Sequence, residues 1–297
     1  MKILITGGAG FIGTTLVPKL LEEGHEVTVF DILLHGGNPI VPFFKNKKFK
    51  FIKGDIRDYD ALESAVKDQD IIIHLAAVVG FPACRLNPQA AKDINVQGTA
   101  NLIKASSKEQ IILYGSTGSN YGTIKGICTE TEAERLLIER GNIIAYRFAT
   151  AFGTSPRMRM DLLVNDFAYK CIKDGYIVVY EKHFMRTFIH VSDIADSFIF
   201  GIKNIDMMID NIYNVGHECM NYSKQEICEM IVSKTGAFVH FEEIGEDADK
   251  RNYIVSYDKI GKLGFKTNVT LSEGVDEIVE VLKIMDFQND YTNAKYI

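Results

Sequence analysis

The stretch from Ile3 to Asp31, ILITGGAGFIGTTLVPKLLEEGHEVTVFD, predicts a strand, a glycine-rich turn, a helix and a second strand. Each of three glycines in the turn suits a separate task in a dinucleotide-binding βαβ unit. Gly7 permits the tight turn, Gly10 lets a pyrophosphate approach the backbone, and Gly13 lets the helix pack closely against the strand. Because the helix N-terminus then faces negative charge, the stretch predicts a dinucleotide site.

The second apolar run ends in Asp31, 18 residues after Gly13. A carboxylate at this position accepts hydrogen bonds from both hydroxyls of the adenosine ribose and repels a 2′-phosphate. The residues that follow, ILLHGG at 32–37, contain no arginine that could bind such a phosphate. The sequence therefore predicts NAD, and not NADP, as the cofactor.

Short apolar runs alternate with helical stretches as far as residue 150. This alternation indicates βαβ units and a parallel sheet covered by helices on both faces. We expect a Rossmann-type, doubly wound α/β domain over residues 1–155, with residues 187–216 returning to it. A smaller C-terminal substrate lobe is expected from residues 156–186 and 217–297.

Composition narrows the range of partners. The net charge of −6 argues against a nucleic-acid surface, and no run approaches the ~18 apolar residues of a membrane span. The five cysteines are scattered and never spaced C-x-x-C, which fits a reducing cytoplasm and argues against structural zinc. The seven histidines have no metal-ligand spacing, so we expect no metal site. His74 lies in an apolar strand and is expected to be a hydrogen-bonded core histidine.

Short motifs follow the glycine turn in a fixed order along nearly the whole chain. They are GDIRD at 54–58, HLAA at 74–77, NVQGTANLI at 95–103, STGSNYG at 116–122, RTFIHVSDIA at 186–195, YNVG at 213–216 and KLGF at 262–265. With the spacing G-x-x-G-x-x-G, this set resembles the extended short-chain dehydrogenase/reductase family. Its NAD-dependent epimerases and dehydratases act on nucleotide sugars.

The resemblance implies a set of binding residues. Besides the glycines and Asp31, the cofactor-binding residues would be Phe11, Ile12, Asp55, Ile56, Leu75, Ala76, Ala77, Asn95 and Ser116. The substrate-binding residues would be Val79, Gly80, Asn165, Arg186 and Arg251. An arginine suits that role because its planar fork binds phosphate oxygens bidentately. The substrate would be a GDP-, UDP- or dTDP-linked sugar, and the family's homodimers pack through the helix at 89–106 and the catalytic helix.

Two further stretches are less generic. VVGFPACRLNP at 78–88 and PRMRMDLLVNDF at 156–167 resemble a sub-branch found with bacterial surface-polysaccharide sugars, including GDP-heptose pathways. That sub-branch oxidises or epimerises a sugar at C4. Arg157 and Arg159 within the second stretch could reach a sugar phosphate or cap a loop.

The expected catalytic pair departs from the family pattern. The resemblance assigns Thr117 to the sugar oxygen that becomes a ketone, followed by a helical Tyr-x-x-x-Lys whose lysine lowers the pKa of the tyrosine. Between Tyr114 and Gly141 the one Tyr-x-x-x-Lys is Tyr121 with Lys125, next to a glycine and ahead of the recognisable helix. Counting back from Glu134, which matches the end of the catalytic helix, leaves Gly126 in the tyrosine position.

Three interpretations stay open. The chain binds NAD without chemistry, or Tyr121 and Lys125 have replaced the usual pair, or a segment of roughly 15 residues that holds the pair is absent from this sequence. A 4,6-dehydratase is disfavoured, because Gly118 and Ser119 stand where such enzymes of this family carry an Asp-Glu pair. The sequence thus predicts an NAD-dependent oxidoreductase or epimerase acting at C4, or a related protein that only binds NAD and a nucleotide sugar.

Overall fold

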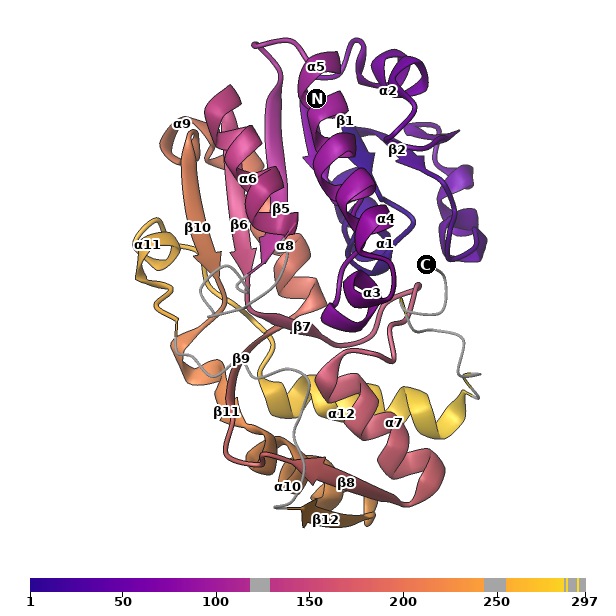
Figure 1. The fold of residues 1–297 in the computed structure, drawn as a ribbon, viewed down its shortest axis with the longest axis vertical. Helices are drawn as coiled ribbons and strands as arrows, with labels where there is room; N and C mark the ends of the chain where they lie inside the picture. Colours follow the sequence, from indigo (N-terminus) through magenta and orange to yellow (C-terminus); the bar gives the residue numbers. More distant parts are fainter. Residues whose placement is uncertain (118–128, 243–254, 286, 288–292, 294–297) are drawn as a thin grey trace.

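A computed structural model describes residues 1–117, 129–242, 255–285, 287 and 293 (Figure 1). Its largest element is a seven-stranded sheet with the order β10-β6-β5-β4-β1-β2-β3, in which every neighbouring pair is parallel. The strands are β1 (Lys2–Thr6), β2 (Glu26–Asp31), β3 (Phe49–Lys53), β4 (Ile71–His74), β5 (Ile111–Thr117), β6 (Ile143–Phe148) and β10 (Asn211–Val215). The order reverses between β1 and β4, as in a Rossmann sheet, so the predicted fold class is confirmed.

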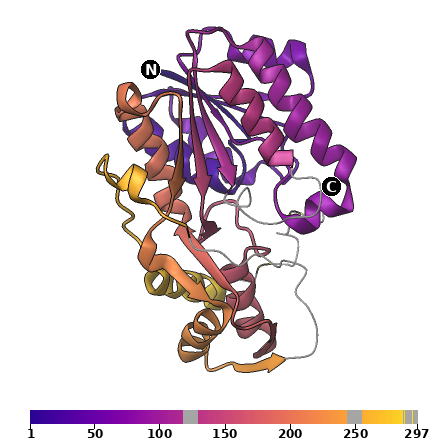
Figure 2. The same cartoon turned by 60° about the vertical axis from the view of Figure 1, so that its left-hand side comes forward.

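Helices cover both faces of the sheet (Figure 2), and alternate residues of β1 belong to the two cores on its opposite faces. Ile3 and Ile5 pack with α1 (Phe11–Glu22) and α8 (Val191–Lys203). Leu4 faces the other layer, which consists of α2 (Tyr59–Val66), α5 (Gly98–Ala105) and α6 (Thr129–Arg140). Because both faces are covered, the strands read as continuous apolar runs instead of alternating ones.

A second hydrophobic core lies below the carboxyl edge of this sheet (Figure 1). It is built by helices α7 (Leu163–Asp174), α10 (Lys224–Thr235) and α12 (Leu271–Ile284) and by small sheets. The strands of these sheets are β7 (Thr150–Phe152), β9 (Met185–His190) and β11 (Asn221–Ser223) in one group, and β8 (Tyr176–Tyr180) with β12 (Phe238–Glu242) in another. The division at residue 155 stays a prediction.

Shorter elements join the larger ones. They are the 3-10 turns η1 (Asn38–Lys45) and η4 (Glu218–Met220), and the helices α3 (Phe81–Leu86), α4 (Pro88–Lys92), α9 (Ile205–Met208) and α11 (Asp258–Gly261). The helical stretch expected at 89–106 is interrupted by a π-helical turn, η2 (Asp93–Gln97), between α4 and α5. Among the described residues, no helix has the length and apolar character that crossing a membrane requires.

His74 joins three elements of the Rossmann sheet. Its Nδ1 lies 2.7 Å from the Thr6 hydroxyl on β1, and its Nε2 lies 3.0 Å from the Thr99 hydroxyl on α5. Burial lowers the pKa of His74 to about 4, so the ring is neutral near pH 7. The expected role as a hydrogen-bonded core histidine is confirmed.

Candidate active site

Gly7, in the turn between β1 and α1, and Gly13, in the first turn of α1, have no room for a side chain. A Cβ on Gly7, whose φ is +74°, would lie 2.6 Å from the backbone nitrogen of Ala76. A Cβ on Gly13 would lie 2.5 Å from the Cα of Gly8. Gly10 differs, because its Cβ would meet only the Gly7 carbonyl oxygen, at 3.1 Å. Gly7 and Gly13 are therefore required for close backbone packing, whereas Gly10 is the position at which a ligand can approach the backbone.

Asp31 ends β2 beside this turn. Its Oδ2 accepts a hydrogen bond from the backbone N–H of Ala9 at 3.0 Å, and its Oδ1 accepts one from Leu33 at 2.7 Å. Burial raises the pKa of this carboxyl, although the two N–H donors oppose the shift. The carboxylate is thus fixed in orientation and retains lone pairs for the ribose hydroxyls.

We expect the affinity for NAD to fall as the pH is lowered. The fall should begin at a higher pH than it would if Asp31 had the pKa of an ordinary aspartate. The ionised Asp31 is the form that accepts hydrogen bonds from both hydroxyls, and its raised pKa means that the form is lost earlier as pH drops. Asp31→Asn should lower NAD affinity about tenfold and flatten this pH dependence. Titrations with NAD at several pH values measure both effects, with the exposed Asp60→Asn on α2 as the control. An unchanged pH profile in Asp31→Asn would contradict the assignment.

Asn95 fixes the loop after β4 through two hydrogen bonds with the backbone of Val78. Its Oδ1 accepts a hydrogen bond from the Val78 N–H at 2.7 Å, and its Nδ2 donates to the Val78 carbonyl at 2.9 Å. Asn95 lies in the π-helical turn, a local geometry that often marks functional sites. The loop begins with Leu75 and Ala76, whose N–H groups donate to Thr6, so the expected cofactor-lining residues lie directly opposite the glycine turn.

Asp55 and Ile56 follow β3 at the same edge of the sheet. The guanidinium of Arg57 binds the Asp55 carboxylate at 2.5 Å and holds its pKa below the usual range. Ile56 is buried, and a Cβ on Gly98 would lie 2.4 Å from its Cδ1. Asp55 is thus ion-paired with Arg57, and a contact of its carboxylate with the adenine would be additional to this ion pair.

A polar cluster of Ser116, Glu134 and Arg147 lies at the carboxyl end of β5, with Ser116 and Glu134 buried and Arg147 partly exposed. The Ser116 hydroxyl donates to Glu134 Oε2 at 2.5 Å. Arg147 on β6 binds the same carboxylate with Nη2 at 2.5 Å and with Nε at 3.1 and 3.2 Å. Glu134, on α6, is 2% exposed, so its charge depends on these partners. Thr117 ends β5 one residue later and pairs with Phe148 in the backbone register.

Two of the residues expected to bind the substrate, Arg186 and Asn165, are buried and contact different parts of the chain. Arg186 is 1% exposed on β9, with its guanidinium near the Phe184 ring and donating to the Met185 carbonyl. The Asn165 amide exchanges hydrogen bonds with the backbone of Gly153 at 3.1 and 2.8 Å and donates to the Arg159 carbonyl at 3.0 Å. It therefore supports the segment after β7, and its contact with substrate stays a prediction.

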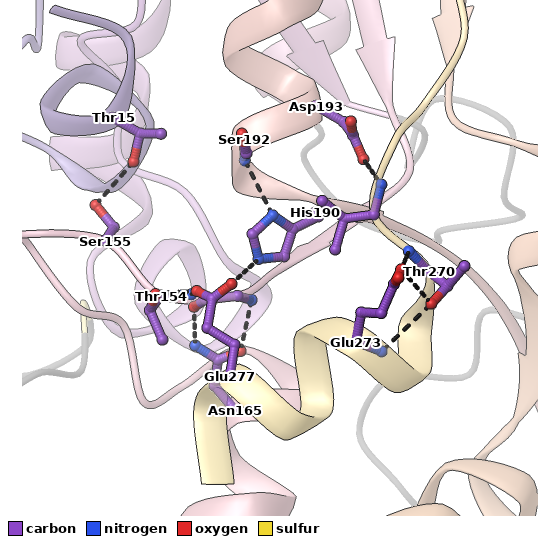
Figure 3. A network of polar contacts seen from close by, with 12 residues as sticks. Thr15, Thr154, Ser155, Asn165, His190, Ser192, Asp193, Thr270, Glu273 and Glu277 are labelled. Carbon is purple, nitrogen blue, oxygen red and sulfur yellow. Dashed lines mark hydrogen bonds and ion pairs between the residues drawn. The ribbon is translucent and has the colours of Figure 1, made fainter. Parts of the chain in front are cut away.

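A polar network that the sequence did not suggest links β9, α12 and the segment that follows β7 (Figure 3). His190 Nε2 lies 3.4 Å from Glu277 Oε2, and Glu277 Oε1 accepts from both the N–H and the hydroxyl of Thr154. Burial raises the pKa of Glu277, but the contact with His190 and the hydrogen bonds from Thr154 outweigh it and lower that pKa below its usual value. No motif could have paired these residues, because the contact joins positions far apart in the chain.

The structure thus gathers the glycine turn, Asp31, the loop at 75–80 and the end of β5 at one edge of the sheet. Tyr121, Lys125 and Arg251 lie outside the described residues. Within the described part of the chain, no three His, Cys, Asp or Glu side chains are grouped as a metal site. The glycine turn, whose crowded glycines flank an approachable Gly10, and the fixed Asp31 carboxylate fit a dinucleotide.

This fold and site define the chain as a dinucleotide-binding protein of the Rossmann class. Residues 3–139 match the model of the NAD dependent epimerase/dehydratase family. An uncharacterized protein of Methanocaldococcus jannaschii is 30% identical over 311 residues, which cover 92% of this chain and 94% of that one. The chain belongs to the NAD-dependent epimerase/dehydratase family.

Two further relatives indicate the range of this family. The UDP-glucuronic acid decarboxylase 1 of Arabidopsis thaliana is 27% identical over 321 residues, 99% of this chain and 71% of that protein. The structure of UDP-glucuronic acid 4-epimerase from Bacillus cereus, in complex with UDP-glucuronic acid and NAD, superimposes with a TM-score of 0.83. The two proteins are 24% identical, and the superposition covers 95% of this chain and 99% of the epimerase. At this identity the similarity shows a shared fold only.

Proposed function

We propose that this protein oxidises the C4 hydroxyl of a nucleotide sugar, as an oxidoreductase or a 4-epimerase. The observation that carries the proposal is the convergence of the cofactor-side loops with the end of β5, whose last residue is Thr117. Bound NAD would supply the acceptor for the C4 hydride. The chain's own residues would fix the ribose through Asp31 and hydrogen-bond the C4 oxygen through Thr117.

The proton acceptor in this proposal is Tyr121. Helix α6 begins at Thr129, so Tyr121 and Lys125 both precede it in the sequence. A loop would therefore have to bring the tyrosine and the ammonium together, which is the second of the three interpretations above. The proposal does not include a 4,6-dehydratase, because Gly118 and Ser119 carry no acid or base.

Mixing the protein with NAD and a panel of UDP-, dTDP- and GDP-linked sugars should produce NADH absorbance in a single turnover. Tyr121→Phe should lower the rate by about 100-fold or more, because the phenyl ring cannot take the proton. Tyr59→Phe, which removes a hydroxyl bonded to Glu63 on α2, is the matched control and should leave the rate unchanged. Product analysis by NMR then separates net oxidation from epimerisation.

A catalytically inactive sensor or partner subunit is the rival. It predicts NAD binding without NADH formation from any sugar, so the same assay decides between them. An intact mass above 33.3 kDa would instead point to an additional segment that holds the usual Tyr–Lys pair. If Tyr121→Phe retains full activity, the assignment of Tyr121 is wrong.

The identity of the nucleotide and the assembly are parts of the same proposal. UDP-linked sugars deserve the first test, since the Bacillus cereus 4-epimerase of the same fold was solved in complex with UDP-glucuronic acid. We propose a homodimer through the helical stretch at 89–106 and α6, which light scattering can test. We also propose a cytoplasmic location, since among the described residues Cys84, Cys171, Cys219 and Cys228 form no disulfide.

A further inference from the structure

We propose that Glu277, on α12 in the second hydrophobic core, is a positioning residue for the NAD site, because its carboxylate holds both polar supports of helix α1. NAD dependence is a property of the family, and the proposed reaction at C4 is not involved. A chain that binds NAD without turnover therefore tests this role equally well.

The first support lies at the start of α1. This helix begins at Phe11, and its N-cap is Gly10, which has no side chain to cap the helix. The hydroxyl of Ser155 donates to the Phe11 carbonyl at 2.7 Å, and the Thr15 hydroxyl donates to Ser155 Oγ at 3.2 Å (Figure 3). Ser155 is buried and so fixes the helix end that faces the diphosphate of a bound dinucleotide.

Glu277 holds the residue that precedes Ser155. Its Oε1 accepts a hydrogen bond from the Thr154 N–H at 3.1 Å and another from the Thr154 hydroxyl. Thr154 and Ser155 are consecutive, so a displacement of the Glu277 carboxylate also displaces the hydroxyl that supports α1. One oxygen of Glu277 therefore connects α12 to the first turn of the cofactor helix.

The second support lies further along α1. The ammonium of Lys19 donates to Ser192 Oγ at 2.9 Å and to Asp196 Oδ1 at 2.5 Å, both on α8. His190 caps α8, because its Nδ1 accepts the Ser192 N–H at 3.3 Å. Since Nδ1 is the acceptor, the neutral ring carries its proton on Nε2, which lies 3.4 Å from Glu277 Oε2. The second oxygen of Glu277 therefore orients the ring that caps the helix bound by Lys19.

The ring of His190 fits closely between α12 and the segment after β7. A Cβ on Gly274, in α12, would lie 3.1 Å from His190 Cδ2, and a Cβ on Gly153 would overlap His190 Nε2. His190 itself is 4% exposed. Close contact on both sides restricts the ring to an orientation in which Nε2 faces Glu277 (Figure 3).

Glu277 itself is only partly buried, with 39% of its side chain exposed. Its replacement therefore leaves a smaller cavity than that of a core residue. We expect a shift of Ser155 and His190, not loss of the fold. A site whose helix must first be reordered binds its ligand more weakly.

The test is calorimetric titration of the full chain with NAD. Glu277→Ala should weaken NAD binding about fivefold or more, and Glu277→Gln, which keeps one acceptor oxygen for Thr154, about two- to threefold. Glu280→Ala, at an exposed position of the same helix, is the matched control and should leave the affinity unchanged. Chemical denaturation without NAD shows whether each variant is folded at the titration temperature. A merely structural role would lower stability without changing the affinity of the folded protein.

A double-mutant cycle with Ser155→Ala tests the route to α1. Ser155→Ala alone should weaken NAD binding, and the double variant should lose less affinity than the product of the two single losses, because both changes remove one support. Losses that multiply fully would overturn the proposal, since the two residues would then act separately.

Binding of NAD by folded Glu277→Ala within twofold of the wild type would also overturn the proposal. An equal loss in Glu280→Ala would do the same, because any change on α12 would then suffice. If Glu277→Ala does not fold, Glu277→Gln decides: wild-type affinity refutes the role of Glu277, and weakened binding supports it. A wild-type chain that does not bind NAD refutes it as well, whereas NAD binding without turnover contradicts only the proposed reaction.

Discussion

Gly13→Ala should destabilise the protein by about 3 kcal/mol and abolish measurable NAD binding. The new Cβ would lie 2.5 Å from the Gly8 Cα and from the Gly8 carbonyl oxygen, so backbone must move before the methyl group fits. The shift would open the turn that presents N–H groups to the pyrophosphate. Chemical denaturation measures the stability, and titration with NAD measures the affinity.

Gly10→Ala separates the two consequences. Its Cβ would meet only the Gly7 carbonyl oxygen at 3.1 Å, so we expect nearly full stability together with a large loss of NAD affinity. Gly261→Ala on α11 meets no atom within 4 Å and should alter neither property. If Gly13→Ala proves as stable as Gly261→Ala, then close packing of α1 on the turn is not what requires this glycine.

Glu134→Ala should cost about 3 kcal/mol, because it leaves the Arg147 guanidinium and the Ser116 hydroxyl without the carboxylate that both bind. Glu139→Ala is the matched control on the same helix. Glu139 contacts Arg135 at 3.8 Å in an exposed i,i+4 pair, which contributes less than about 0.5 kcal/mol. Chemical denaturation of both variants measures the difference.

A double-mutant cycle with Arg147→Met tests the origin of this cost. Removal of both charges should restore part of the stability, since neither charge is then left without its partner, although the cavity left by Ala at position 134 remains. Additive losses in Glu134→Ala and Arg147→Met would show that the two side chains act independently. Equal losses in Glu134→Ala and Glu139→Ala would show that burial of the cluster is unimportant for stability.

The glycine turn illustrates what a local pattern predicts. Gly7, Gly10 and Gly13 lie within seven consecutive residues, so their spacing and the helix that follows specify the geometry almost alone. The same holds for Asp31, which ends the next strand and binds the turn. His74 was also predictable, because a histidine inside an apolar strand must find partners for both ring nitrogens.

The chain around Asn95 was predictable only in part. The motif at 95–103 indicated a helix, but the π-helical turn and the two hydrogen bonds between the Asn95 side chain and the Val78 backbone were not visible in it. Likewise, Asn165 was expected to bind the substrate, whereas its side-chain amide contacts backbone groups in the structure. A motif places a residue near a site without specifying which atoms it binds.

By itself the sequence determined the fold class and the family, and it predicted the cofactor-binding edge, because apolar periodicity, glycine spacing and a strand-terminal carboxylate act over short distances along the chain. Only the tertiary structure decided that Arg157 meets Asn293, that His190 meets Glu277, and that Glu134 joins Ser116 to Arg147. The physical reason is that these side chains pair across separate elements. Their contacts exist once two hydrophobic cores have packed, and no local pattern encodes that packing.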